Sequence, residues 1–138
     1  MGQQQLLLLV LGIVIVGLAV VAGINAFEEN QEKSTKDAIV NEGMRVATDV
    51  KAYALKPDQL GGGGGSLPDN LSDAGFETNN GNYDTPWGPI TYSSGDSDNN
   101  FPGELTLNID SGSETATIEI PENGSPSLTS GSGGDTWN

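Results

Sequence analysis

The first 27 residues of the chain contain no charged side chain, and Leu6–Ile24 form an unbroken apolar run of 19 residues. Fourteen of these are Leu, Ile or Val, and the other five are Ala or Gly. As a helix rising about 1.5 Å per residue, the run is roughly 28 Å long, close to the hydrocarbon thickness of a bilayer. Its aliphatic side chains favour membrane insertion by roughly 4–8 kcal/mol. Because water is a poor solvent for such a helix, residues 1–27 are predicted to lie in lipid or against other protein.

A cleaved secretory signal is the first alternative for this segment. Such signals combine a basic n-region with a core of about 7–15 apolar residues and a small-residue cleavage site. Here no Lys or Arg precedes Leu6, and the core is longer. We therefore expect the segment to stay attached as a membrane anchor, with its N-terminus inside and the bulk of the chain outside. The positive-inside rule does not decide this orientation, because Glu28, Glu29 and Glu32 are followed by Lys33 and Lys36.

Composition argues against several classes of function. The chain has no Cys and no His, so it lacks a thiolate, a disulfide framework and the commonest metal ligand and general base. Only carboxylates, hydroxyls and amides remain for chemistry. We therefore expect no enzymatic activity and no small-molecule substrate.

The net charge of −14 is unevenly distributed along the chain. All five basic residues lie between positions 33 and 56, whereas residues 57–138 carry 13 acids and no base. Such a segment repels nucleic-acid phosphates and anionic lipid headgroups, so no nucleic-acid partner is expected. Two interpretations remain open: a surface that favours solubility, and a surface that binds cations.

The helix is predicted to continue beyond the apolar run, because residues 25–56 contain no Pro. Apolar or small residues recur at helical spacing at Ile39, Gly43, Val46, Val50 and Tyr53, with Val40, Met44, Ala47 and Ala54 beside them. Polar residues are placed on the opposite face: Lys36, Asp37, Glu42, Arg45, Asp49 and Lys51. Because Pro57 blocks continuation, one helix of residues 1–56 is expected, apolar over 1–27 and amphipathic over 28–56.

Residues 57–68 form a glycine-rich loop around Gly61–Gly65. A phosphate-binding P-loop is excluded, since no Lys precedes Ser66 and Pro68 follows where a helix should begin. The remaining interpretations are a flexible hinge and a close-packed loop between helix and sheet.

Residues 69–138 are predicted to form an acidic domain rich in short strands. Apolar and polar residues alternate in Glu104–Ile109 and Thr115–Ile120, and the turn-forming residues 110–114 join them as a hairpin. Further strands are expected at Ile90–Ser93, after the Pro86–Pro89 turn, and at Pro126–Thr129 on an edge. The predicted fold class is α+β, in which the amphipathic helix covers the apolar face of a small antiparallel sheet.

One acidic stretch, Asp96–Asn100, resembles the start of a calcium loop. An EF-hand is excluded, because Phe101 and Leu107 stand where the motif needs Gly and Glu. An irregular oxygen-liganded Ca²⁺ site at Asp96 and Asp98 remains as an alternative prediction; no other cofactor is expected.

The layout of the chain resembles that of type IV pilins and of the pseudopilins of type II secretion. In these families a short leader precedes an apolar helix, its amphipathic continuation, a loop and a small antiparallel sheet. The Met1-Gly2-Gln3 start is similar to a shortened prepilin cleavage site, and Asp84–Tyr92 resembles the Asp-Pro-Trp-Gly…Tyr segment of major pseudopilins. The end, Gly133–Asn138, is similar to the Trp-containing tail of that family. Where pilins carry a Glu near the mature N-terminus, this chain has Gln5, or Leu7 if it is cut after Gly2.

The resemblance implies a structural subunit of an extracellular pilus-like filament. Identical subunits are the expected partners, with the inner membrane holding the chain before assembly at the cell surface. Two alternatives are a pseudopilin that forms short Ca²⁺-dependent fibres, and a single-pass membrane protein with an extracytoplasmic binding domain that does not polymerise. The residues expected to pack between subunits lie on the apolar helix: Gln3, Gln4, Gln5, Leu6, Leu9, Gly12, Ile13, Val16, Gly17, Ala19, Val20 and Gly23.

Overall fold

A computed structural model of the chain describes residues 2–95, 101–109 and 114–132. The chain divides into two compact units, residues 1–34 and residues 35–138, which are described separately. The predicted calcium residues, Asp96 and Asp98, and the C-terminal Trp-containing stretch lie outside the described residues.

A single helix, α1 (Gly2–Leu55), accounts for all the described residues of the first unit and continues into the second. The prediction of one unbroken helix is confirmed, and α1 ends one residue before the expected Lys56. In the first unit, every described residue is exposed. Length and composition make this helix capable of crossing a membrane.

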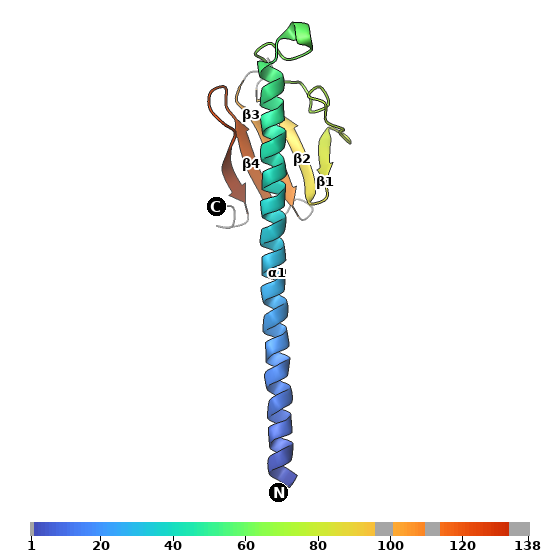
Figure 1. Cartoon of the computed structure of the whole chain (residues 1–138), viewed down its shortest axis with the longest axis vertical. Helices are drawn as coiled ribbons and strands as arrows, with labels where there is room; N and C mark the ends of the chain where they lie inside the picture. Colours follow the sequence, from blue (N-terminus) through green and yellow to red (C-terminus); the bar gives the residue numbers. More distant parts are fainter. Residues whose placement is uncertain (1, 96–100, 110–113, 133–138) are drawn as a thin grey trace. The chain divides into compact units, whose positions relative to one another are not determined.

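The second unit contains one antiparallel sheet of five strands in sequence order (Figure 1). The strands are β1 (Asn82–Thr85), β2 (Gly88–Ser93), β3 (Gly103–Ile109), β4 (Glu114–Ile120) and β5 (Ser127–Ser132). The predicted α+β class, with a helix packed on a small antiparallel sheet, is therefore confirmed. The strand β1 is not expected from the sequence, because four residues without an apolar alternation give no strand signal.

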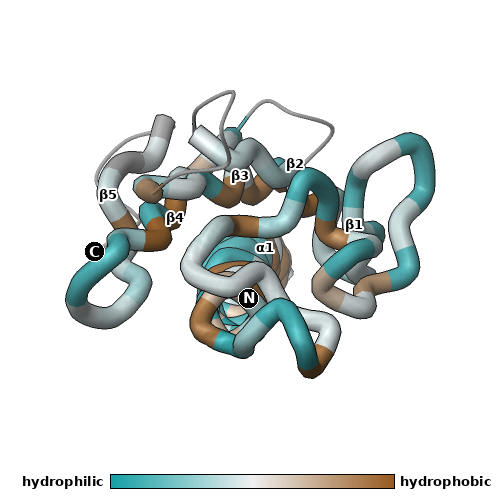
Figure 2. Tube along the Cα trace, turned by 90° about the horizontal axis from the view of Figure 1, so that it is seen from above, coloured by the Kyte–Doolittle hydropathy of each residue, from teal (hydrophilic) through white to brown (hydrophobic). Residues whose placement is uncertain are grey.

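The core of the second unit lies between α1 and one face of the sheet. Figure 2 looks down α1 and shows the sheet curving around one side of the helix. The alternation predicted for β3 and β4 points Leu105, Leu107 and Ile109, with Ala116, Ile118 and Ile120, towards the helix. From α1 the fully buried apolar residues are Ile39, Val46, Ala47, Val50 and Ala54.

Two residues of α1 differ from the expected faces. Tyr53 is predicted on the buried stripe but is partly exposed, whereas Ala54, predicted beside the stripe, is fully buried. Lys36 is predicted on the solvent face but is only 3% exposed, and its Nζ lies 2.9 Å from a carboxylate oxygen of Glu114 on β4. Lys36 lies three residues before Ile39 and seven before Gly43, so helical geometry puts it on the same stripe. Burial of its charge requires the partner carboxylate that β4 provides.

Gly43 sets the closest approach of α1 to the sheet. A Cβ atom there would lie 2.6 Å from Leu107 Cδ2 and 2.8 Å from Ile118 Cδ1. Both residues are fully buried, so the absence of a side chain at Gly43 lets the helix backbone come close to β3 and β4.

The glycine-rich loop is packed against the end of α1. After a 3₁₀ turn, Asp58–Leu60, successive backbone N–H groups donate to carbonyls at the end of the helix: Gly63 to Tyr53 (2.9 Å), Gly64 to Lys56 (2.9 Å) and Gly65 to Ala54 (2.7 Å). These bonds satisfy acceptors that a helix end otherwise leaves unpaired. The structure therefore favours the close-packed loop over the hinge.

Candidate functional site

The first candidate surface is the apolar part of α1. The Leu, Ile and Val side chains of residues 6–24 are 52–69% exposed. At about 100° per residue, Leu6, Leu9, Ile13, Val16 and Val20 lie along one side of the helix. We call this row the apolar seam.

The other residues expected at subunit contacts surround the apolar seam, with one exception. Gly12, Ala19 and Gly23 follow one edge of the seam at spacings of seven and four residues, and Gly17 lies on the other edge. Gln5 lies close to the seam, whereas helical geometry places Gln4 about 140° from Leu9, on the far side of the helix. The structure thus places most of this set on one half of α1. That these residues contact other subunits stays a prediction.

Among the described residues, nothing packs against the three glycines of this surface. Apart from the neighbouring backbone of the helix itself, a Cβ atom built at Gly12, Gly17 or Gly23 would meet no described atom within 4 Å. Each glycine in a helix interior costs roughly 1 kcal/mol relative to Ala. Small residues at such positions allow a neighbouring helix backbone to approach closely in a membrane or an assembly.

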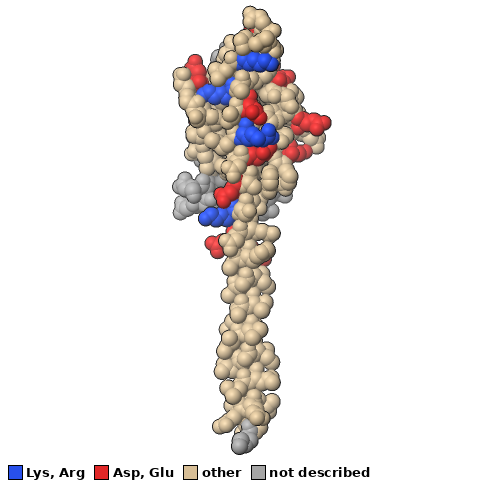
Figure 3. Space-filling view, in the orientation of Figure 1, with Lys and Arg blue, Asp and Glu red and all other residues tan. Residues whose placement is uncertain are grey.

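The basic residues of the second unit are confined to α1 and the residue that follows it. Its four basic residues, Lys36, Arg45, Lys51 and Lys56, belong to α1 or follow it directly, and the rest of the unit carries only acids. Figure 3 shows blue side chains along the helix, with red ones beside it and on the flanking elements. The exposed side of α1 therefore provides the cations available on this unit.

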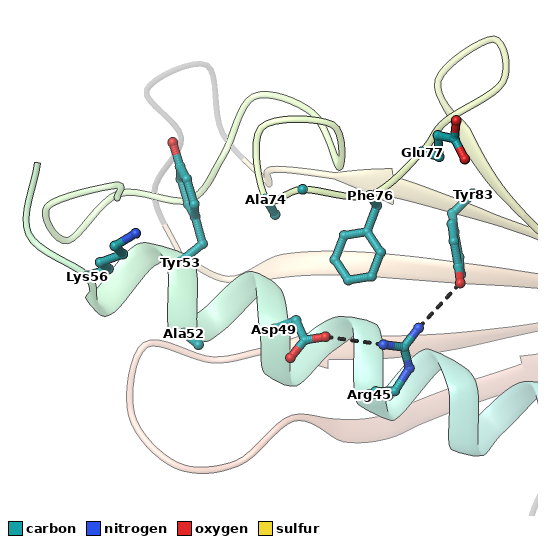
Figure 4. A pocket seen from close by; sticks show the side chains of 10 residues that line it. Arg45, Asp49, Ala52, Tyr53, Lys56, Ala74, Phe76, Glu77 and Tyr83 are labelled. Carbon is teal, nitrogen blue, oxygen red and sulfur yellow. Dashed lines mark hydrogen bonds and ion pairs between the residues drawn. The ribbon is translucent and has the colours of Figure 1, made fainter. Parts of the chain in front are cut away.

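The second candidate site is a groove of about 660 Å³ beside the C-terminal part of α1 (Figure 4). We call it the aromatic groove. Tyr53 and Lys56 lie at one end, Arg45 and Tyr83 at the other, and Phe76 between them. Its remaining lining residues are Asp49, Ala52, Ala74, Gly75 and Glu77.

A network of polar and aromatic contacts holds the Arg45 end of the groove. The Arg45 guanidinium donates to both carboxylate oxygens of Glu42 (2.6 and 3.2 Å) and to the hydroxyl of Tyr83 (3.3 Å). The hydroxyl of Tyr83 in turn donates to Glu42 (3.0 Å). The guanidinium carbon lies 5.8 Å from the centre of the Phe76 ring, which packs edge-on against Tyr83 at 5.3 Å. These contacts hold the wall of the groove in place without a ligand.

The same network shifts the titration of its members. Hydrogen bonding from Arg45 lowers the pKa of the Glu42 carboxyl below its usual value, and the bond from Tyr83 adds to this effect. Burial raises the pKa of Tyr83, and its bond to Glu42 raises it further. Glu42 is therefore held as a carboxylate and Tyr83 as a neutral phenol at neutral pH. Arg45 and Asp49 form a longer, half-exposed ion pair of 3.5 Å, as expected for solvated neighbours on the helix.

Residues 2–95, 101–109 and 114–132 contain no group of three or more His, Cys, Asp or Glu side chains that could hold a metal ion. The Ca²⁺ prediction for Asp96 and Asp98 falls outside these residues and stays a prediction, as does the expected absence of enzymatic activity.

The aromatic groove and the Lys36–Glu114 ion pair do not follow from the expectations drawn from the sequence. Helical periodicity is the signal that could place Lys36 on the buried stripe. The groove has no such signal, because Phe76 and Tyr83 lie in a loop and in the unexpected β1, far from Arg45 along the chain.

A long N-terminal apolar helix followed by a small antiparallel sheet is a pilin-like architecture. No protein-family model matches the chain, and no curated protein or solved structure matches it either. The likeness to pilins is therefore one of architecture, and function must be argued from the two candidate surfaces.

Proposed function

We propose that this chain is the structural subunit of a pilus-like filament, held in a membrane by α1 before assembly. The observation that carries this proposal is the exposed apolar part of α1, which belongs to the same unbroken helix that covers the sheet. Burying one Leu, Ile or Val side chain favours a structure by about 1.5–3 kcal/mol, so fourteen exposed ones cannot remain in water. These side chains are buried in lipid before assembly and against the helices of identical subunits afterwards.

The small residues beside the apolar seam support polymerisation over simple anchoring. A helix that only needs to dissolve in lipid gains nothing from Gly12, Ala19 and Gly23 in one row. Helices that pack against each other do gain, because a small side chain lets two backbones approach and make van der Waals contact. In the described part of the chain, no side chain lies within 4 Å of where a Cβ atom at Gly12 or Gly23 would be.

The absence of native cysteine allows a direct test by disulfide cross-linking. In the double variant Leu9→Cys/Val20→Cys, each subunit carries two thiols on the apolar seam. Oxidation of surface material from cells that make the full chain is expected to give a ladder of many covalently linked subunits on a non-reducing gel. An open helical polymer uses two different surfaces of each subunit and therefore continues without limit, whereas a symmetric dimer closes.

The single variants Leu9→Cys and Val20→Cys are the matched controls, because one thiol per chain cannot link more than two subunits. If the double variant also stops at dimers, or stays monomeric in the membrane fraction, the chain is an anchored protein that does not polymerise. The pseudopilin alternative makes a separate prediction: Ca²⁺ should raise the melting temperature of the full chain, and a chelator should lower it.

A further inference from the structure

We propose that the second units of neighbouring subunits contact each other head to tail, with Trp87 of one copy docked in the aromatic groove of the next. This proposal deepens the filament function and rests on it. It identifies a second interface, separate from the apolar seam, and its occupant is a second copy of this chain.

Trp87 is presented at the tip of the β1–β2 hairpin. Within the described part of residues 35–138, the well-exposed large apolar side chains are Leu55, Leu60 and Trp87, and Trp87 is 40% exposed. A large exposed aromatic side chain on a hairpin tip is typical of an anchor at a protein–protein interface.

The hairpin tip is rigid, so Trp87 is held ready for binding. The hydroxyl of Thr85 donates to the Gly88 carbonyl (2.6 Å) and accepts from the backbone N–H groups of Trp87 (3.3 Å) and Gly88 (3.2 Å). Gly88 adopts a φ of 149° and lies so close to β3 that a Cβ atom would be 1.9 Å from the Asn108 carbonyl oxygen. Because the loop is already ordered, docking it costs little conformational entropy.

The aromatic groove has the chemistry that an indole ring favours. Tyr53 and Phe76 offer aromatic surfaces, Ala52 on the helix and Ala74 on the facing loop offer small apolar ones, and Lys56 supplies a cation at one end. Docking removes from water the 40% of the Trp87 surface that is still exposed, and a cation over the face of the ring adds to that attraction. The groove volume of about 660 Å³ leaves room for a large side chain and part of its turn.

The hairpin that carries Trp87 also carries an acid that the groove attracts. Asp84 is exposed on this hairpin, and Lys56 is exposed at the Tyr53 end of the groove. At the opposite end lies Arg45, whose side chain is 53% exposed, with Glu77 near Tyr83. Asp84 therefore meets a cation at either end of the groove, which favours docking without fixing its direction.

Trp87 cannot fill the groove of its own chain. A Cβ atom at Gly88 would lie 3.4 Å from Ile39 Cδ1, so the hairpin tip sits beside the Ile39 level of α1. The groove begins at Arg45, six residues or about 9 Å further along the helix, and reaches Tyr53 at about 21 Å. A tip and a groove at different levels of one unit make a heterologous contact, which repeats from copy to copy and builds an open polymer.

Cross-linking through this interface tests the proposal. The double variant Pro86→Cys/Ala52→Cys keeps Trp87 and Tyr53, and places one thiol beside Trp87 and the other in the groove; it is expected to give a ladder of linked subunits after oxidation of assembled material. The matched control, Pro86→Cys/Thr129→Cys, moves the second thiol to an exposed residue of the edge strand β5 and should not give a ladder. In addition, Trp87→Ala should reduce the yield of assembled material by about tenfold or more, while Trp87→Phe retains most of it.

The outcomes separate this inference from the filament function. If Leu9→Cys/Val20→Cys forms a ladder but Pro86→Cys/Ala52→Cys does not, the docking of Trp87 is wrong and the filament function stands. If neither pair forms a ladder, both proposals fail. A Pro86→Cys/Ala52→Cys disulfide within one chain, or an equal ladder in the Thr129 control, would also overturn the docking contact.

Discussion

Substitution Gly63→Ala tests whether the glycine-rich loop is a packed cap on α1. The N–H of Gly63 donates to the Tyr53 carbonyl at 2.9 Å, and its own carbonyl accepts from Ser66 at 2.9 Å. An added Cβ atom would lie 2.0 Å from the Ser66 carbonyl oxygen, closer than real Cβ atoms approach such a group. The obstructing atom is backbone, so the loop itself must open.

The expected cost follows from the bonds that would be lost. An opening of about 1 Å breaks the two hydrogen bonds of Gly63, and each unmade bond costs about 1–2 kcal/mol at this helix end. We therefore expect Gly63→Ala to destabilise the second unit by about 2–4 kcal/mol. For a unit of this size, that corresponds to a fall in melting temperature of about 10–20 °C.

The assay is thermal unfolding of the full chain in detergent. Unfolding is monitored by the near-ultraviolet circular dichroism of the aromatic residues. Gly61→Ala is the graded control: Gly61 has a φ of 77°, but an added Cβ would meet nothing within 4 Å, so only about 1–2 kcal/mol is expected. Ser66→Ala, on an exposed side chain, should change little. A Gly63→Ala chain that melts within about 2 °C of the wild type would refute the packed cap.

Three further predictions concern separate parts of the chain. Lys51 donates to the carbonyls of Pro121 (2.9 Å) and Gly124, so Lys51→Met should lower the free energy of unfolding by roughly 1–3 kcal/mol, whereas Met at the exposed Lys33 should not. Burial raises the pKa of Tyr92, so this residue should stabilise the fold below its unfolded pKa of about 10 and lose that effect as pH rises further. Urea unfolding at stepped pH measures this slope, and Tyr92→Phe should reduce it, leaving the part due to Tyr83, whose pKa is also raised. Gly23→Leu should leave the chain in the membrane fraction but reduce the amount of shearable filament, while the matched Val21→Leu should change neither quantity. Equal filament yields from the two variants would contradict close helix packing at Gly23.

Much of the fold can be predicted from the sequence because hydrophobic periodicity is a local signal. The alternation in β3 and β4, and the helical spacing of Ile39, Val46 and Val50, are enough to identify the two sides of the core. The end of α1 follows from Pro57. The strand β1 cannot be predicted in this way, because its four residues form a strand only through pairing with β2.

The two candidate sites also differ in how far the sequence alone predicts them. The apolar part of α1 needs no tertiary structure to be recognised, since its composition alone requires a non-aqueous environment. The aromatic groove depends on Arg45, Phe76 and Tyr83 meeting across the fold, and no sequence pattern joins them. The expectation for Lys36 is wrong because a charged side chain signals exposure, whereas its position on the helix and the carboxylate of Glu114 make burial feasible.

Electron microscopy of material sheared from the surface of cells that make this chain tests the filament proposal most directly. An antibody against the second unit is expected to label filaments along their whole length. These filaments should be lost in the variant Leu9→Arg, which places a charge on the apolar seam. A chain found only as dispersed monomers in detergent extracts of the membrane, with no labelled filament at the surface, would contradict it.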